Sequence, residues 1–293
     1  MSPLWILHRA IMAVIRHLPL PLGRFGFRAY HKLLRTWRPT YIGRSFFGAR
    51  FVCSMQDLIQ RTIFYFGVWE PDVSHVIEQR LAAGDVFVDI GANIGYDTLL
   101  ASHLVGRTGQ VVSIEASGRT FALLQRNLSL NDAANVRAVH VAIADRPGKL
   151  ELYETDAGNI GAATTLPSRG GRLLETVEAL PLLSVLSPAE LARIRLIKMD
   201  VEGAEPAILR QILAQLPRFP ASMDIIVEAS PHDDPAWNAV FAEMRAFGFT
   251  AYEIANVYET DWYLQWRRPT PLVPIDALPP RLQDLLFTRQ FRG

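Results

Sequence analysis

The sequence predicts an α/β protein in which a mostly parallel sheet carries helices on both faces. Short apolar runs alternate with longer segments of helical periodicity, and the runs are apolar on both faces, as is typical of strands covered by helices. We expect strands at residues 86–90, 110–115, 136–142, 194–199 and 223–229. We expect helices at residues 71–82, 96–104, 118–130, 204–216 and 235–247.

Length and composition indicate one substantial domain with two additions. With 293 residues, 49% of them apolar and 20% charged, the chain can bury a sizeable core. We expect a basic helical extension over residues 1–63, a cofactor-binding α/β domain over 64–268, and a proline-rich tail over 269–293 with a short helix at 281–287. The single cysteine, Cys53, excludes an internal disulfide and favours a reducing, cytoplasmic setting.

The first fifty residues are strongly basic, with eight arginines, one lysine and no acid, although the net charge of the chain is only +1. Their apolar run is interrupted by His8, Arg9 and Arg16, so it is too short and too charged to span a bilayer. An amphipathic basic helix can lie on an anionic membrane surface, at the inner face of the membrane, or dock a partner. The alternative interpretation is a helical cap whose arginines face solvent or pair with the acidic remainder of the chain. Nucleic acid is not expected, because the aromatic residues here fit a packed segment as well as a stacking platform.

A glycine-containing bend after the first expected strand predicts a site for a nucleoside cofactor. Glycines let the backbone approach a ligand, and amide groups at a helix start attract a carboxylate or phosphate. A dinucleotide fingerprint needs a third glycine, which this bend lacks, so an NAD- or nucleotide-sugar-dependent enzyme is the alternative rather than the first interpretation. The candidate cofactor residues of this segment are Asp89, Gly91, Ala92, Asn93 and Gly95.

A second acid, Glu115, ends the next expected strand, where its carboxylate can accept hydrogen bonds from both hydroxyls of a ribose. The acid at position 89 would repel a pyrophosphate but suits an ammonium group. S-adenosylmethionine carries an ammonium, a carboxylate and a ribose, so this pattern favours it over NAD. Ala116 and Ala142, beside the ends of two strands, complete the candidate cofactor residues.

Four segments together resemble the FkbM family of S-adenosylmethionine-dependent methyltransferases over about residues 64–266. They are D-I-G-A-N-x-G at 89–95, E-A-S at 115–117, K-M-D-V-E-G-A-E at 198–205 and I-I-V-E-A-S at 225–230. The resemblance implies a class I, Rossmann-like fold with a mostly parallel seven-stranded sheet. It also implies an antiparallel hairpin near residues 250–254 and 262–266, and hydroxyls of sugars, glycans or secondary metabolites as acceptors.

Methyl transfer to a hydroxyl requires an aligned acceptor and a group that takes its proton. The carboxyl ends of neighbouring parallel strands meet at one crevice, so polar residues there are the ones to consider. The candidates for this chemistry are Lys198, Asp200, Glu202, Glu228 and His232.

Three interpretations of this group stay open. In the first, Asp200 or His232 is the general base and Lys198 orients the carboxylates. In the second, Asp200, Glu202 and Glu228 hold a divalent cation that lowers the pKa of the hydroxyl.

The third interpretation is structural: Glu202 or Glu205 caps the helix that starts near Ala204, where the helix dipole favours negative charge. A cofactor-binding scaffold without catalysis is then the alternative to an enzyme.

Overall fold

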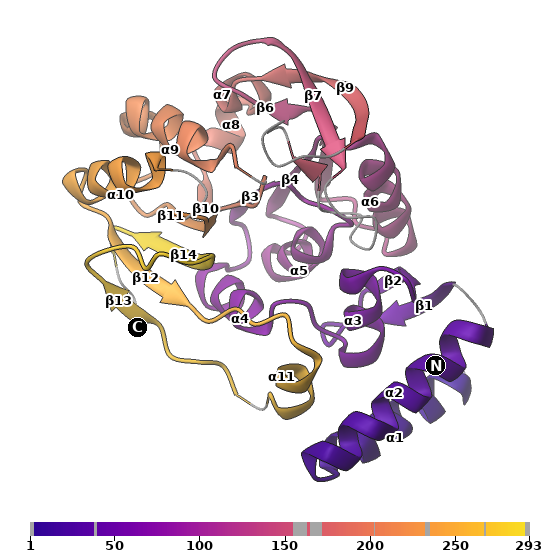
Figure 1. The fold of residues 1–293 in the computed structure, drawn as a ribbon. Helices are drawn as coiled ribbons and strands as arrows, with labels where there is room; N and C mark the ends of the chain where they lie inside the picture. The colour runs from indigo at the N-terminus through magenta and orange to yellow at the C-terminus, as the bar shows by residue number, and fades with distance from the viewer. Residues whose placement is uncertain are drawn as a thin grey trace. The chain divides into compact units, whose positions relative to one another are not determined.

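The computed structural model describes residues 3–37, 40–154, 163–164, 172–201, 203–231, 235–266 and 268–290. The chain forms two compact units, one from residues 1–71 and 256–269 and the other from residues 72–255 and 270–293 (Figure 1). Among the described residues, no helix combines the length and the hydropathy needed to cross a membrane. The three-part division with boundaries at residues 63 and 268 stays a prediction alongside these units.

The smaller unit consists of helices and one antiparallel hairpin. Its elements are α1 (Pro3–His17), α2 (Leu20–Trp37), β1 (Thr40–Arg44), β2 (Arg50–Ser54), α3 (Leu58–Phe66) and α11 (Thr260–Gln265).

A buried histidine joins the helices of this unit. The ring of His8 bonds the Tyr30 hydroxyl through Nδ1 and the Phe64 carbonyl oxygen through Nε2, each at 2.9 Å. Burial lowers the pKa of His8 to about 4, so the ring is neutral near pH 7. The hairpin adds Cys53, a free and fully buried cysteine whose thiol pKa is raised by burial to about 12. Both side chains are therefore neutral near pH 7 and stabilise the unit by packing.

The larger unit is built around an eight-stranded sheet in the order β13-β12-β14-β11-β10-β3-β4-β5. The five strands from β11 to β5 are parallel, and β14 pairs antiparallel with both β11 and β12. The strands are β3 (Val86–Ile90), β4 (Gln110–Glu115), β5 (Val136–His140), β10 (Ile194–Met199), β11 (Asp224–Ala229), β12 (Thr250–Ile254), β13 (Val273–Ile275) and β14 (Gln283–Thr288).

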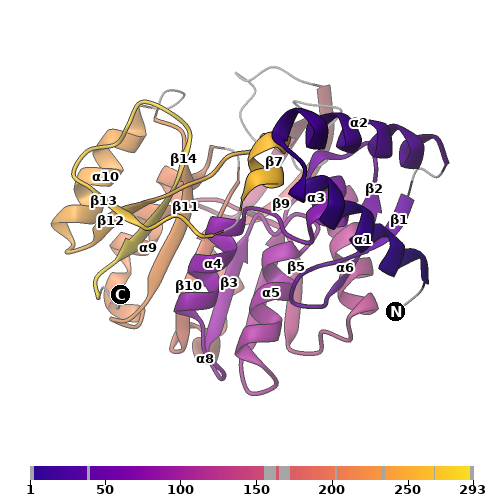
Figure 2. The same cartoon turned by 90° about the horizontal axis from the view of Figure 1, so that it is seen from below.

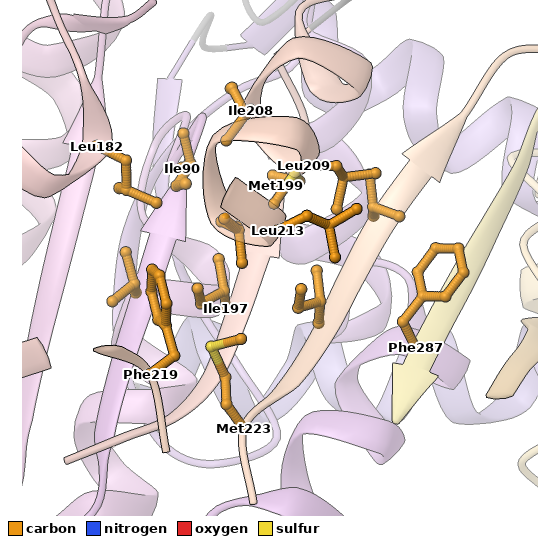
Figure 3. Packing of buried hydrophobic residues seen from close by; sticks show 14 of the residues in the cluster. Ile90, Leu182, Ile197, Met199, Ile208, Leu209, Leu213, Phe219, Met223 and Phe287 are labelled. Atoms are coloured by element: carbon orange, nitrogen blue, oxygen red, sulfur yellow. The ribbon is translucent and has the colours of Figure 1, made fainter. Parts of the chain in front are cut away.

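Helices cover both faces of this sheet, with α4, α5 and α6 on one side and α9 and α10 on the other (Figures 1 and 2). Side chains alternate between the two faces of each strand. Ile90, Ile197 and Met199 therefore point to the α9 side, where they pack with Ile208 and Leu209 (Figure 3). The helices are α4 (Pro71–Arg80), α5 (Tyr96–Val105), α6 (Gly118–Leu130), α7 (Leu182–Val185), α8 (Pro188–Leu191), α9 (Glu205–Ala214) and α10 (Ala236–Ala246), with a 3₁₀ turn at Leu216–Arg218.

A second sheet of four strands, in the order β6-β9-β7-β8, follows β5 in the chain. The strand expected at 136–142 therefore divides: β5 ends at His140, and Ala142 belongs to the second sheet. The strands are β6 (Ala142–Ile143), β7 (Gly148–Glu154), β8 (Ala163–Thr164) and β9 (Arg172–Leu180).

The central parallel strands and their helices confirm the expected fold class, but the edge of the sheet differs. The sheet has eight described strands rather than seven. Residues 262–266 were expected to be a strand, yet they fall in and just after α11, which buries the neighbouring Tyr263 and Leu264. A strand would send those two side chains to opposite faces.

The tail also differs from expectation: in place of a helix at 281–287, residues 283–288 form the strand β14. Leu285, Leu286 and Phe287 are consecutive and fully buried. A strand that lies between two others and is covered on both faces accommodates such a run, whereas a surface helix would expose part of it.

Replacing Phe287 with alanine should lower the free energy of unfolding by about 3–5 kcal/mol, because the ring is fully buried in the main core. Urea unfolding followed by circular dichroism measures this loss. The matched control is Phe247→Ala, since that ring is 50% exposed. Equal losses in the two variants would contradict the placement of the tail within the sheet.

Candidate cofactor-binding and active site

The bend after β3 touches the segment after β10 so closely that only glycine fits. Gly91 has φ of +80°, and a Cβ added there would lie 1.8 Å from the carbonyl oxygen of Asp200. The backbone N–H of Asp200 donates to the carbonyl oxygen of Ile90 at 2.9 Å. The ends of these two neighbouring strands are therefore held together through their backbones.

Backbone hydrogen bonds occupy the amide groups of the bend itself. Gly91 and Ala92 both donate to the carbonyl oxygen of Ile114 at 2.9 Å, and Gly95 donates to Ala92 at 2.9 Å. Asn93 has φ of +50°, and its side-chain oxygen accepts from the N–H of Ile94 at 2.8 Å. The amides expected to receive a ligand carboxylate are thus engaged within the protein, and the N-terminal end of α5, where the helix dipole is positive, is the remaining anion-attracting feature beside the bend.

Glu115 lies beside this bend and is bonded to it. Its Oε2 accepts from the N–H of Asn93 and its Oε1 accepts from the N–H of Ser117, both at 2.8 Å. Burial raises the pKa of Glu115 to about 7, against the lowering effect of those two bonds. Each carboxylate oxygen keeps a second lone pair, so the side chain can still accept from two hydroxyl groups.

A chain of hydroxyl groups holds the carboxylate of Asp89. Register places Asp89 opposite Ser113 on β4, and both face α5. The Thr98 hydroxyl donates to Asp89 Oδ2 at 2.6 Å and lies 2.8 Å from the Ser113 hydroxyl. Because Thr98 has one hydroxyl hydrogen, Ser113 is the donor in the second bond.

The ammonium group of Lys198 lies close to several carboxylates. Lys198 lies opposite Asp89 in the sheet register, and its Nζ is 3.1 Å from Asp97 Oδ2 and 3.8 Å from Asp200 Oδ2. Burial raises the pKa of Asp89, with Lys198 acting in the other direction. Three carboxylates around one cation leave the crevice with excess negative charge when they are ionised.

Other sequence candidates divide between this crevice and the neighbouring turn. Glu228 follows Val227, the register partner of Met199, so this penultimate residue of β11 lies at the level of Asp200. Glu205 accepts from the N–H groups of Val201 and Gly203 at 2.8 and 2.9 Å, so it bonds the turn that precedes α9. Glu202 and His232 lie outside the described residues.

The two candidate alanines lie where the small sheet meets this site. Ala142 is buried in a small apolar cluster with Val177 and Ala179, and Ala116 packs against that cluster. Glu175 of β9 accepts from the N–H of Gly118 at 2.8 Å, at the start of α6. The second sheet therefore borders the segment that carries Glu115.

Within the described ranges, no group of three or more histidine, cysteine, aspartate or glutamate side chains is arranged to hold a metal ion. The described residues therefore do not support the cation expected from Asp200, Glu202 and Glu228, and Glu202 itself lies outside them.

Sequence reasoning missed Asp97, Thr98 and Ser113. The sequence did show that two polar residues, Asp97 and Thr98, stand second and third in the expected helix. The structure shows that they are buried, at 6% and 0% exposed. Helical periodicity does not reveal which polar residues near a helix start turn inward. Their contacts depend on how α5 packs on β3 and β4.

These features define a class I methyltransferase type of site: a glycine bend after the first parallel strand, with an acid at the end of the next. The family model of the methyltransferase FkbM domain matches residues 89–251, more than half of the chain. The protein belongs to the FkbM methyltransferase family.

Matches to individual relatives cover only part of the chain. The chain is 29% identical over 162 residues to the methyltransferase sdnD of Sordaria araneosa, a match that covers 45% of this chain and 62% of that protein. It is also 29% identical over 141 residues to methyltransferase 1 of Beauveria bassiana, covering 42% of this chain and 56% of the relative. The chain thus spans less than two thirds of either relative.

Among solved structures, an S-adenosylmethionine-dependent O-methyltransferase from Thermotoga maritima aligns with a TM-score of 0.43 and 14% identity, over 87% of this chain and 79% of that one.

Replacing Gly91 with alanine should lower the free energy of unfolding by more than about 2 kcal/mol, because a side chain there meets both a positive φ and the Asp200 carbonyl oxygen. Chemical denaturation measures this loss. The control is Gly148→Ala, where a Cβ has nothing within 4 Å. A variant as stable as the control would show that the bend does not require glycine.

Proposed function

We propose that the protein binds S-adenosylmethionine in this crevice and transfers its methyl group to a hydroxyl of a sugar, glycan or small metabolite. One observation carries the proposal: Asp89 Oδ1 and Asp97 Oδ1 are buried and lack a hydrogen-bond partner among the described residues. A buried carboxylate oxygen without a donor costs free energy. A cationic ligand with N–H donors would supply what these oxygens need.

The donor and acceptor set fits the three polar parts of this cofactor. Asp89 would accept from the ammonium group, and the positive end of the α5 dipole would attract the carboxylate. The remaining lone pairs of Glu115 would accept from the ribose hydroxyls. This assignment uses residues from β3, β4 and α5, all within the larger unit.

Bound S-adenosylmethionine supplies an electrophilic methyl group on a sulfonium sulfur. The protein's part is to orient the acceptor and take its proton. Asp200 suits the second role, because its side chain is 32% exposed whereas those of Lys198 and Asp97 are 8% and 7% exposed. Lys198 would hold the Asp200 carboxylate in place through their 3.8 Å ion pair.

Replacing Asp200 with asparagine should leave S-adenosylmethionine affinity nearly unchanged and slow methyl transfer by about a hundredfold to ten-thousandfold, the usual contribution of a general base. Transfer of labelled methyl to a panel of sugars, glycans and hydroxylated metabolites measures the rate, and calorimetry measures affinity. The control is Asp276→Asn, because that side chain is 95% exposed.

Full activity in the Asp200 variant would remove this residue from the base role. Binding of NAD in place of S-adenosylmethionine would contradict the cofactor assignment. Tight binding of S-adenosylmethionine with no transfer to any acceptor class would favour a cofactor-binding scaffold.

Affinity for S-adenosylmethionine should rise about tenfold between pH 6 and pH 8. Burial raises the pKa of Glu115 to about 7, and both a cation and hydroxyl donors favour its ionised form. Between the ordinary glutamate pKa and 7, the folded protein holds protons that the unfolded chain has released. The free energy of unfolding of the ligand-free protein should therefore fall as pH rises through that window.

Titration calorimetry in two buffers of different ionisation enthalpy measures both affinity and proton release. Glu115→Gln should flatten the profile and weaken binding at pH 8 by about 1–3 kcal/mol. Glu178→Gln, at an exposed position of β9, is the control. A profile in Glu115→Gln as steep as that of the parent protein would assign the proton to another group.

A further inference from the structure

The first two helices expose apolar side chains that their own unit does not bury. Ile6, Leu7 and Val14 on α1 and Leu22, Phe25 and Leu33 on α2 are between 55% and 73% exposed. Scattered single apolar residues are normal on a protein surface, but six within two packed helices form a patch. We call these six residues the apolar face.

Packing places the two halves of this face side by side. Ile15 of α1 contacts Gly26 of α2, with 3.5 Å between Ile15 Cγ1 and a Cβ built on Gly26. Leu22 lies four residues before Gly26 and Leu33 seven residues after it, which puts both on the side of α2 next to α1. Val14 immediately precedes Ile15 on α1. We infer that the apolar face flanks the line along which the two helices pack; Figure 1 shows α1 and α2 side by side.

A row of basic side chains borders the apolar face. Arg24, Arg28, Lys32 and Arg35 recur every three or four residues along α2 and are all exposed. Arg24 forms an ion pair with Asp261 of α11, within the same unit. No acidic residue occurs in the first fifty residues, so nothing on these two helices offsets their positive charge.

A small hollow on the flank of α1 adds to this charge. It has a volume of about 270 Å³, and Arg9, Arg16 and His17 line it together with apolar and aromatic side chains. Arg16 also donates to the carbonyl oxygen of Trp266 at 2.7 Å, which fixes this guanidinium beside the hollow.

We propose that α1 and α2 form a membrane-binding surface that lies on an anionic lipid bilayer. The apolar face would enter the boundary between head groups and acyl chains, and the basic row would lie at the level of the phosphates. An exposed apolar stripe beside a basic stripe is the pattern that such a helix requires. A bilayer with neutral head groups would bind the apolar stripe but would not attract the basic one. This inference does not depend on the chemistry of the methyltransferase site.

The test is co-sedimentation of the full chain with vesicles made of equal parts phosphatidylcholine and phosphatidylglycerol, and with vesicles of phosphatidylcholine alone. Binding to the anionic vesicles should be at least about tenfold tighter and should weaken as salt is added. Phe25→Ser and Arg28→Glu should each weaken it by roughly ten- to thirtyfold.

The matched controls lie in the larger unit. Phe247→Ser replaces a ring that is 50% exposed at the end of α10, and Arg126→Glu reverses an exposed charge on α6. Both should bind vesicles as the parent protein does. Thermal unfolding of all four variants checks that each remains folded, as substitutions at exposed positions should allow.

Three outcomes would overturn the proposal: no sedimentation with either vesicle, equal binding to both, or equal losses in the control variants. Sedimentation velocity distinguishes the main competing explanation. If Phe25→Ser dissociates a dimer while vesicle binding is absent, the apolar face is an interface between copies of this chain.

Discussion

The contact between Gly91 and the Asp200 carbonyl oxygen constrains everything else in the site. The bend after β3 and the segment after β10 meet through backbone atoms, with a distance that leaves no room for a Cβ. This approach fixes Asp200 relative to Asp89, and hence both carboxylates relative to Lys198. Since glycine is required on steric grounds, the constraint does not depend on any ligand.

Formation of the crevice around that contact costs folding free energy. It buries acids in a region where Lys198 is the cation they face, and two carboxylate oxygens lack hydrogen-bond donors among the described residues. Burial raises the pKa of Glu115 to about 7, so the protein relieves part of this cost by binding protons. A cationic ligand bound nearby, with hydroxyl groups that donate to Glu115, would favour release of those protons. The buried acids that lower the free energy of unfolding of the ligand-free protein are therefore the same groups that would favour binding of a positive charge.

The sheet that carries the site depends on the last part of the chain. β14 lies between β11 and β12, so residues near the C-terminus complete the centre of one half of the sheet. Its side chains Leu285, Leu286 and Phe287 are fully buried. Pairings between segments that are far apart in sequence carry a loop-closure cost that local helices do not. The smaller unit, by contrast, buries His8 and Tyr65 in an aromatic core of its own.

Local sequence determined the parallel strands, their helices, the glycine bend and Glu115, because apolar periodicity and glycine spacing are set within a few residues. The same information misassigned 281–287, since a short apolar run fits a strand or a helix equally well until its neighbours are known. The strand at 262–266, which the family resemblance implied, is replaced by α11 in this chain. It also missed Asp97 and Thr98, which reach Lys198 and Asp89 through the packing of α5. Tertiary structure alone decided these contacts, because they join residues whose proximity depends on strand order and helix orientation rather than on sequence separation.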